Sequence, residues 1–315
     1  MNMRVLAVDD DPVILDLLQV ILRQEGHETV VVRSGSAALD LLARPDERFD
    51  VLVLDITMPE MDGVELCGRI RNLPLYAHSP IIMLTAMSDS HSIETAFSAG
   101  ANDYITKPFD VKGIGPRLQV AERMMAENRK ALDVGPMVPK PLEMKGEHDI
   151  AFQDAALING VDHHTDEFSL GNYLSTMEKH RVEQSSVFAA HICAFDRLYE
   201  NCTKQELQII LKETWIAIAA AADHARFLGA YVGSGNFILI TTSEIQDEWN
   251  GLELLIEANL ACSEPLKKAN LTSSVRVLLG RPFRPNASKT KRVKPTFDRA
   301  RLLLQKRLEM ESDAG

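Results

Sequence analysis

The sequence predicts two domains in succession, first an α/β domain with a doubly wound, five-stranded parallel sheet and then an α+β domain with a mainly antiparallel sheet. Through the first 110 residues, short continuous apolar runs alternate with helix-length amphipathic stretches, which is typical of parallel strands covered on both faces. A segment rich in proline and glycine then breaks this pattern. Beyond it, two β-rich arms flank Gly233–Asn236, which indicates a hairpin between antiparallel strands. A length of 315 residues fits two domains.

The first domain is expected to hold five strands and, at its end, a helix from Pro116 to about Leu132. The predicted strands are Val5–Val8, Thr29–Val32, Val51–Leu54, Ile81–Leu84 and Asp103–Thr106. In the helix, Leu118, Met125 and Leu132 recur every seven residues. Such a stripe is typical of a signalling or dimerisation helix, and equally of a helix that covers the sheet.

Three prolines and a glycine in Val134–Pro141 predict a semi-rigid linker. We therefore expect a first domain over 1–130, a linker over 131–147 and a second domain over 148–315. After an irregular start at 148–165, the second domain is expected to hold helices, strands and a hairpin with its helices on one face of the sheet. These elements are a helix at Glu167–Glu183, a strand at Val187–Ala194, a helix at Lys204–Phe227, the hairpin Leu228–Thr242, a helix at Leu252–Leu266, a strand at Ser274–Gly280 and a helix at Pro295–Glu309.

Composition narrows the function classes. The chain has no apolar run of 18 residues and no leader-like start, so we expect a cytoplasmic protein without a membrane segment. The net charge is −11, which disfavours nucleic acid as a partner. The basic stretch Arg281–Lys294 is the exception, and a solvated loop or a docking site for an acidic protein surface is favoured there over nucleic acid.

Cysteine and histidine carry no metal-site pattern. The four cysteines are widely spaced, which predicts buried thiols rather than a zinc site or disulfides. The neighbours His163 and His164 are expected in a solvated loop, because adjacent loop residues rarely face one ion.

Chemistry-bearing residues follow four of the five predicted strands. They are Asp9 and Asp10 after the first strand, Asp55 after the third, Thr85 after the fourth and Lys107 after the fifth. The carboxyl ends of parallel strands meet at one edge of the sheet. Clustered carboxylates there need a counter-charge, and oxygen ligands alone favour Mg2+. Asp55 is the best nucleophile for a phosphoryl group, with Lys107 as a second cation, while Asp11 is expected only to begin a helix.

These residues resemble the receiver domain of two-component response regulators. The matching segments are Val8–Asp10, Leu54–Pro59, Leu84–Ala86 and Lys107–Phe109. The resemblance implies a flavodoxin-like fold and a partner that is a histidine kinase or a phosphotransfer protein. It further implies Mg2+ held by Asp9, Asp10, Asp55 and the Thr57 carbonyl, phosphate on Asp55 in contact with Thr85 and Lys107, and a switch formed by Thr85 and Tyr104.

The predicted hairpin is similar to the signature of the GGDEF family of diguanylate cyclases. Gly233, Ser234, Gly235, Asn236 and Phe237 stand where that family has Gly-Gly-Asp/Glu-Glu-Phe. Gly235 and Asn236 replace both acids, and Ala194 stands at the position of the first metal aspartate. Asp196 alone remains acidic, so the resemblance implies a degenerate domain with no cyclase activity. Gly and Asn at these positions are also what a plain hairpin turn requires.

The sequence thus favours a switch over an enzyme. Phosphorylation of Asp55 is expected to change how an inactive GGDEF-like domain binds an unidentified output protein, and a homodimer is possible. Apart from phosphorylation and dephosphorylation of the receiver itself, no catalysis is expected. The alternatives are a weakly active diguanylate cyclase, and a sensor that binds GTP or cyclic di-GMP without turnover.

Overall fold

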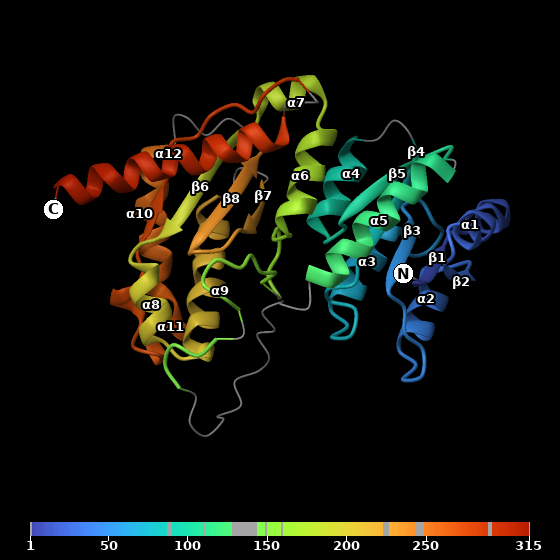
Figure 1. Cartoon of the computed structure of the whole chain (residues 1–315), viewed down its shortest axis with the longest axis horizontal. Coiled ribbons are helices and arrows are strands. Elements are labelled where there is room, and N and C mark those ends of the chain that lie inside the picture. Colours follow the sequence, from blue (N-terminus) through green and yellow to red (C-terminus); the bar gives the residue numbers. More distant parts are fainter. Residues whose placement is uncertain are drawn as a thin grey trace. The chain divides into compact units, whose positions relative to one another are not determined.

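The computed structural model describes residues 2–86, 90–109, 111–127, 144–148, 150–158, 160–222, 227–242, 249–288 and 292–314. The chain forms two compact units, Met1–Arg129 and Lys130–Gly315 (Figure 1). Residues 131–143 of the predicted linker lie outside the described residues.

The first unit contains the predicted parallel sheet. Its strands are β1 (Arg4–Val8), β2 (Glu28–Val32), β3 (Val51–Asp55), β4 (Ile81–Ala86) and β5 (Asp103–Lys107). Their order is β2-β1-β3-β4-β5, and all neighbours are parallel. This confirms the doubly wound, flavodoxin-like arrangement.

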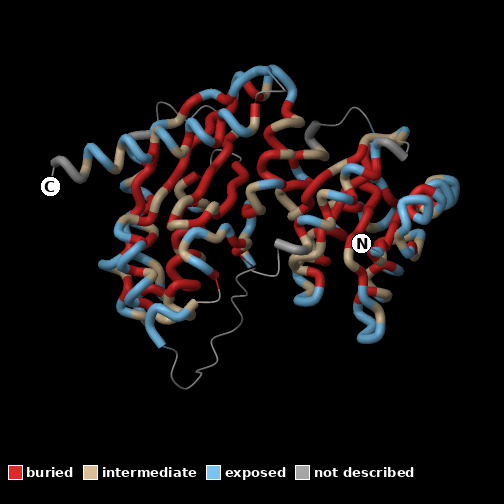
Figure 2. Tube along the Cα trace, viewed as in Figure 1, coloured by how far each residue is buried: buried red, intermediate tan, exposed pale blue. Residues whose placement is uncertain are grey.

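Helices cover both faces of this sheet. They are α1 (Pro12–Gln24), α2 (Gly35–Leu42), α3 (Gly63–Arg71), α4 (Ser90–Ser98) and α5 (Val111–Glu127). Alternate strand residues enter two separate cores: Leu6 and Leu52 pack with residues of α2 and α3, whereas Val5 and Val53 pack with residues of α1 and α5. Continuous apolar strands are the consequence of this double cover, and they are buried along their length (Figure 2).

The helix expected from Pro116 begins five residues earlier, at Val111, so Pro116 lies inside α5. That boundary was wrong because a proline is common at the start of a helix and was taken as its signal. Leu118, Ala121 and Met124 are buried in the core beneath α5. Over 111–127 the stripe therefore covers the sheet; Leu132 lies outside the described residues.

The second unit contains a four-stranded antiparallel sheet, as predicted. Its strands are β6 (Ser186–Ile192), β7 (Phe227–Tyr231), β8 (Asn236–Thr241) and β9 (Val277–Leu279). Their order is β7-β8-β6-β9. β7 and β8 form the predicted hairpin around 232–235.

Helices cover both faces of this sheet as well, so the expectation of one covered face was wrong. The helices α9 (Lys204–Ala221) and α10 (Trp249–Cys262) share a core with Phe188 and Leu239. On the other face, α12 (Val293–Ala314) packs on β6 and β9 and α6 (Glu167–Thr176) contacts β7 (Figure 1). Strands buried at nearly every position, as in β6 and β8, require this double cover.

Several other helix boundaries in this unit differ from the prediction. The predicted helix at 167–183 divides into α6 and α7 (Lys179–Gln184), and α10 is followed by α11 (Glu264–Lys268), which Ser263 caps. The long helix α9 ends at Ala221, and Phe227 already belongs to β7. The sequence analysis missed α8 (Phe195–Asn201).

Two basic residues that were expected in solvated loops are buried. His164 accepts a hydrogen bond from the Tyr231 N–H at Nε2 (3.2 Å), and burial lowers its pKa to about 3, so its ring is neutral. Arg292, within the basic stretch, is 1% exposed and donates to the carbonyls of Leu174 and Met177 at the end of α6. It therefore satisfies helix carbonyls instead of facing a partner. Among the cysteines, Cys262 is exposed, contrary to expectation.

Candidate functional site

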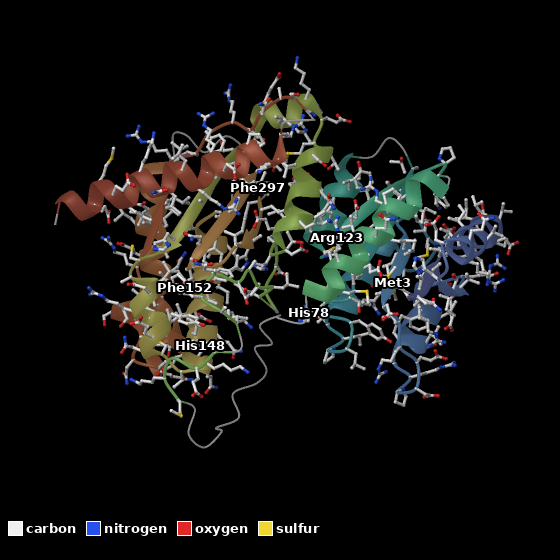
Figure 3. The ribbon with its side chains drawn as sticks, in the orientation of Figure 1. Met3, His78, Arg123, His148, Phe152 and Phe297 are labelled. Carbon is white, nitrogen blue, oxygen red and sulfur yellow. The ribbon has the colours of Figure 1, made fainter. Side chains whose placement is uncertain are left out.

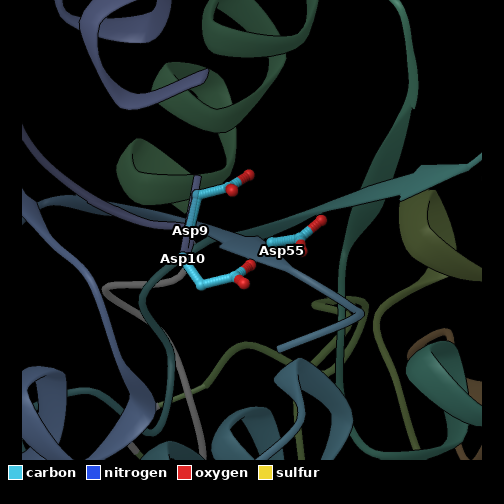
Figure 4. Close-up of side chains that lie close together, drawn as sticks. All are labelled: Asp9, Asp10 and Asp55. Carbon is cyan, nitrogen blue, oxygen red and sulfur yellow. The ribbon is translucent and has the colours of Figure 1, made fainter. Parts of the chain in front are cut away.

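The first unit gathers three carboxylates at the carboxyl edge of its sheet. Asp9 and Asp10 follow β1, and Asp55 ends β3 (Figure 4). Their nearest oxygens all lie within 4.8 Å of one another. Asp9 and Asp55 are buried, at 0% and 4% exposure, and Asp10 is half-buried.

Lys107, at the end of β5, is the counter-charge inside the protein. Its Nζ lies 2.7 Å from Asp9 Oδ2 and 2.6 Å from Asp55 Oδ1. Burial raises the pKa of Asp55 above its ordinary value, although the hydrogen bond from Lys107 opposes this effect. Burial alone would lower the pKa of Lys107, but the carboxylates of Asp55 and Asp9 raise it overall. Three carboxylates against one ammonium leave the site with a formal charge of about −2.

Local structure explains how these side chains are held. Asp11 caps α1 by accepting from Val13 N–H, as expected, and its own N–H donates to Asp9 Oδ1 (3.0 Å). Asp62 caps α3. Gly63 begins that helix so close to β3 that a Cβ would lie 2.0 Å from the carbonyl oxygen of Asp55. Gly63, which has no Cβ, thus allows α3 to begin directly against the end of β3 and acts as a positioning residue.

The remaining predicted residues lie around the same edge. Thr57 follows Asp55 by two residues, and among the described residues no donor binds its carbonyl. Thr85 is the penultimate residue of β4, is 3% exposed, and donates to the Ala86 carbonyl (3.1 Å). Tyr104 of β5 is half-buried and packs edge-on against Phe97, with ring centroids 6.4 Å apart.

The donor set suits a hard divalent cation. The oxygens of Asp9, Asp10 and Asp55, with the carbonyl of Thr57, are the ligand types that Mg2+ takes in proteins. The negative charge that Lys107 leaves uncompensated is the physical reason to expect a cation there.

Fold and site together define the class: the first unit is a receiver domain of the kind found in response regulators. The sequence profile of the response regulator receiver domain matches residues 5–119. The first unit is 46% identical over 109 residues to an uncharacterised 14.6 kDa protein of Leptolyngbya boryana, of which it covers 82%. The chain therefore contains a response regulator receiver domain over residues 5–119.

Two further relatives carry functional names. The DNA-binding response regulator MtrA of Mycolicibacterium smegmatis is 37% identical over 123 residues, which are 39% of this chain and 52% of MtrA. The chain thus matches about half the length of that relative. The chemotaxis response regulator CheY4 of Vibrio cholerae has 30% identity and a TM-score of 0.36, and the match covers 38% of this chain and 99% of that one.

The hairpin of the second unit turns through three residues with positive φ: Gly233 (88°), Ser234 (53°) and Gly235 (75°). The Asn236 amide nitrogen donates to the carbonyls of Gly233 (3.1 Å) and Ser234 (3.2 Å), and its Oδ1 faces His191 Nδ1 at 2.9 Å. Phe237 is fully buried. The turn therefore satisfies its own polar groups.

Aromatic side chains fill the space beneath this turn. A Cβ on Gly235 would lie 2.5 Å from Phe195 Cγ. Phe195 in turn packs against Phe152, with ring centroids 5.6 Å apart, and the Phe152 carbonyl accepts from Ser234 N–H (2.8 Å). Figure 3 shows Phe152 and His148 in the residues that lead into this unit. The sequence analysis missed this packing, because 148–165 has no periodicity to indicate burial.

Ala194 and Asp196, the other two positions compared with the cyclase family, have different surroundings. Ala194 is the N-cap residue that precedes α8; it has a left-handed backbone (φ 51°) and makes no side-chain capping hydrogen bond. Asp196, in the first turn of α8, is exposed. No acidic residue stands at 194, 235 or 236, and Asp196 belongs to no metal-holding cluster among the described residues.

No helix in the described part of the chain combines the length and the apolar character that crossing a membrane demands.

Proposed function

We propose that the chain is a phosphorylation-switched response regulator, with a receiver over 1–130, a linker over 131–147 and a degenerate GGDEF-like output domain over 148–315. The observation that carries the proposal is the bridge of Lys107 between Asp9 and Asp55, beside Asp10. Such a cluster is largely buried and carries a net negative charge, which suits the binding of a metal ion and a phosphoryl group.

In this mechanism a carboxylate oxygen of Asp55 attacks the phosphorus of a donor, and the bond from phosphorus to the leaving group breaks. The donor is a histidine kinase, a phosphotransfer protein or a small acyl phosphate. Asp9, Asp10, Asp55 and the Thr57 carbonyl would hold Mg2+, which would neutralise charge on the phosphoryl oxygens. Lys107 and Thr85 contact the transferred group, and Thr85 with Tyr104 passes the change to the surface.

Labelling tests this assignment directly. Acetyl phosphate should phosphorylate the purified chain with Mg2+ present and not with a chelator, and acetate should be released. Asp55→Asn should abolish labelling, whereas Asp16→Asn, on the first helix, should keep the wild-type rate. Labelling of Asp55→Asn at the wild-type rate would contradict the proposal.

The output is proposed to be binding rather than catalysis. Gly235 and Asn236 offer no carboxylate for metal, and Phe195 occupies the space into which a side chain at 235 would extend. Chromatography after incubation with GTP and Mg2+ should detect no cyclic di-GMP, with or without phosphorylation. Detection of that product would favour the alternative, a weakly active cyclase.

We propose that phosphorylation changes the binding of the second unit to a cytoplasmic protein partner. The other proposed output is a change in the formation of a homodimer. A pull-down that compares phosphorylated wild-type chain with Asp55→Asn tests the first, and sedimentation of the same two samples tests the second. Identical partners and identical profiles would contradict a phosphorylation-controlled output.

A further inference from the structure

A cavity of about 440 Å3 lies in the second unit, between α12 and the end of the sheet that carries the hairpin. Ala189 and Ile238 of the sheet, Leu304 and Leu308 of α12, and Phe152 with Phe195 give it a largely apolar wall. This volume falls within the range of small-molecule sites, which are about 300–1,000 Å3.

Hydrogen bonds fix the tautomer of His191, one of the polar residues that line the cavity. The Asn236 amide nitrogen donates to two carbonyls, so its orientation is set and its Oδ1 faces His191 Nδ1. His191 must therefore carry its proton on Nδ1, because an oxygen acceptor needs a donor opposite it. Burial lowers the pKa of His191, so the ring is neutral and Nε2 presents a lone pair.

Acceptors predominate among the other polar groups of the wall, where the Ser234 hydroxyl can accept as well as donate. Among the described residues, no hydrogen bond or ion pair joins the Asp196 carboxylate to another side chain, and Gln305 uses only its amide nitrogen, on Glu309. The one cation on the wall, Arg301, is already paired with Glu167. The cavity thus offers lone pairs and a carboxylate, with no free positive charge among the described residues that line it.

We propose that this cavity binds a small, largely apolar molecule that carries N–H donors, neutral or cationic, and that it excludes phosphates and carboxylates. A donor group would reach His191 Nε2 and the Asp196 carboxylate, while the planar or aliphatic body packs against the apolar wall. Burial of these acceptors without a donor is unfavourable, which is the basis of the selectivity. Phosphorylation at Asp55 plays no part in this proposal.

Benzamidine and benzoate are suitable probes, because they share one shape and differ in donors and charge. Ligand-observed NMR with the full chain should show binding of benzamidine, weaker binding of neutral benzamide, and none of benzoate or GTP. Binding of benzoate or GTP in preference to benzamidine would overturn the proposal.

Three variants test whether benzamidine binds in this cavity. His191→Phe keeps a ring and removes the acceptor. Asp196→Asn removes a charge at an exposed position, where folding is not at risk. Each variant should lower the affinity for benzamidine about fivefold or more. Leu308→Trp should exclude benzamidine by filling the cavity. Ile216→Ala, at a separate hollow beside Trp215, is the matched control and should leave binding unchanged. Equal affinity in His191→Phe, Asp196→Asn, Leu308→Trp and the wild type would also overturn the proposal.

Discussion

The acidic edge of the first sheet and the hairpin turn of the second unit differ in how far the protein compensates their polar groups. At the edge, Asp9 and Asp55 are buried with one lysine between them, and the charge does not balance. At the turn, Asn236 satisfies the backbone carbonyls and Phe195 fills the space below. A region whose polar groups are left uncompensated needs a ligand, whereas one that satisfies its own polar groups contributes only to structure.

The largest effect is expected when the edge loses its lysine. Lys107→Met leaves Asp9 and Asp55 buried without a counter-charge, and the free energy of unfolding should fall by about 3 kcal/mol in metal-free buffer. Added Mg2+ should recover more stability in this variant than in the wild type. Denaturant unfolding with and without Mg2+ measures both effects.

The matched control is Arg69→Met, which breaks the exposed pair with Glu65. Exposed pairs contribute about 0–1 kcal/mol, so this change should be nearly neutral. Equal losses in the two variants would remove the distinction between the two regions.

The next effect concerns the turn. Gly235→Asp restores an acid, but the new Cβ meets Phe195 and the backbone has a φ of 75°. The free energy of unfolding should fall by about 2 kcal/mol. Adding Phe195→Ala should relieve the clash and leave less than the sum of the two single losses, as a double-mutant cycle would measure. Gly251→Ala, where a Cβ meets nothing within 4 Å, is the control and should stabilise by about 0.5–1 kcal/mol. An unchanged stability in Gly235→Asp would show that the turn still has room for an acid.

These two regions also show how much of the fold and of the candidate site could be predicted from the sequence. The strands of the first sheet were located to within one or two residues, since continuous apolar runs such as Val51–Leu54 are characteristic of strands buried on both faces. The acidic cluster followed, because strand order brings Asp9 and Asp55 to one edge. Phe152 and α8 were missed: the former lies in an aperiodic segment, and the latter is too short for helical periodicity and begins at a left-handed alanine. Contacts made by irregular chain depend on tertiary packing, which a local pattern does not encode.

A smaller effect is expected from the charge of Asp55 itself. Burial raises its pKa in the folded chain, so the protonated form favours folding. That contribution is complete below the pKa of the unfolded chain, about 3.9, and is lost as pH rises through the folded pKa. Asp55→Asn, which is neutral at every pH, should therefore stabilise the metal-free protein by about 1 kcal/mol at pH 7 and by nothing near pH 3. Unfolding curves across that pH range measure the difference, and saturating Mg2+ should cancel the gain. A gain that persists at pH 3 would argue against charge burial as its cause.

The smallest effect tests whether the second region still carries strain. Ala194 has a left-handed backbone and caps α8 with no side chain. Ala194→Asn should stabilise by about 0.5–1 kcal/mol, because Asn tolerates this conformation and can cap a helix. Thermal unfolding, with Ala258→Asn inside α10 as the destabilising comparison, checks this. A loss in both variants would mean that the backbone at 194 is not strained.

The residues that lead into the second unit have a mechanical consequence. Gly146 N–H donates to the Cys202 carbonyl, the Tyr199 hydroxyl donates to the Ile150 carbonyl, and Phe152 is tied to Ser234. Tension applied to the chain at Met144 would load these bonds one after another: first the end of α8, then the hairpin turn, and only afterwards the ladder of β6 and β8. Because each early bond is single while the ladder of β6 and β8 shares its load over six paired residues, the bonds of 146–152 to α8 and to the hairpin turn would break while the sheet stays intact.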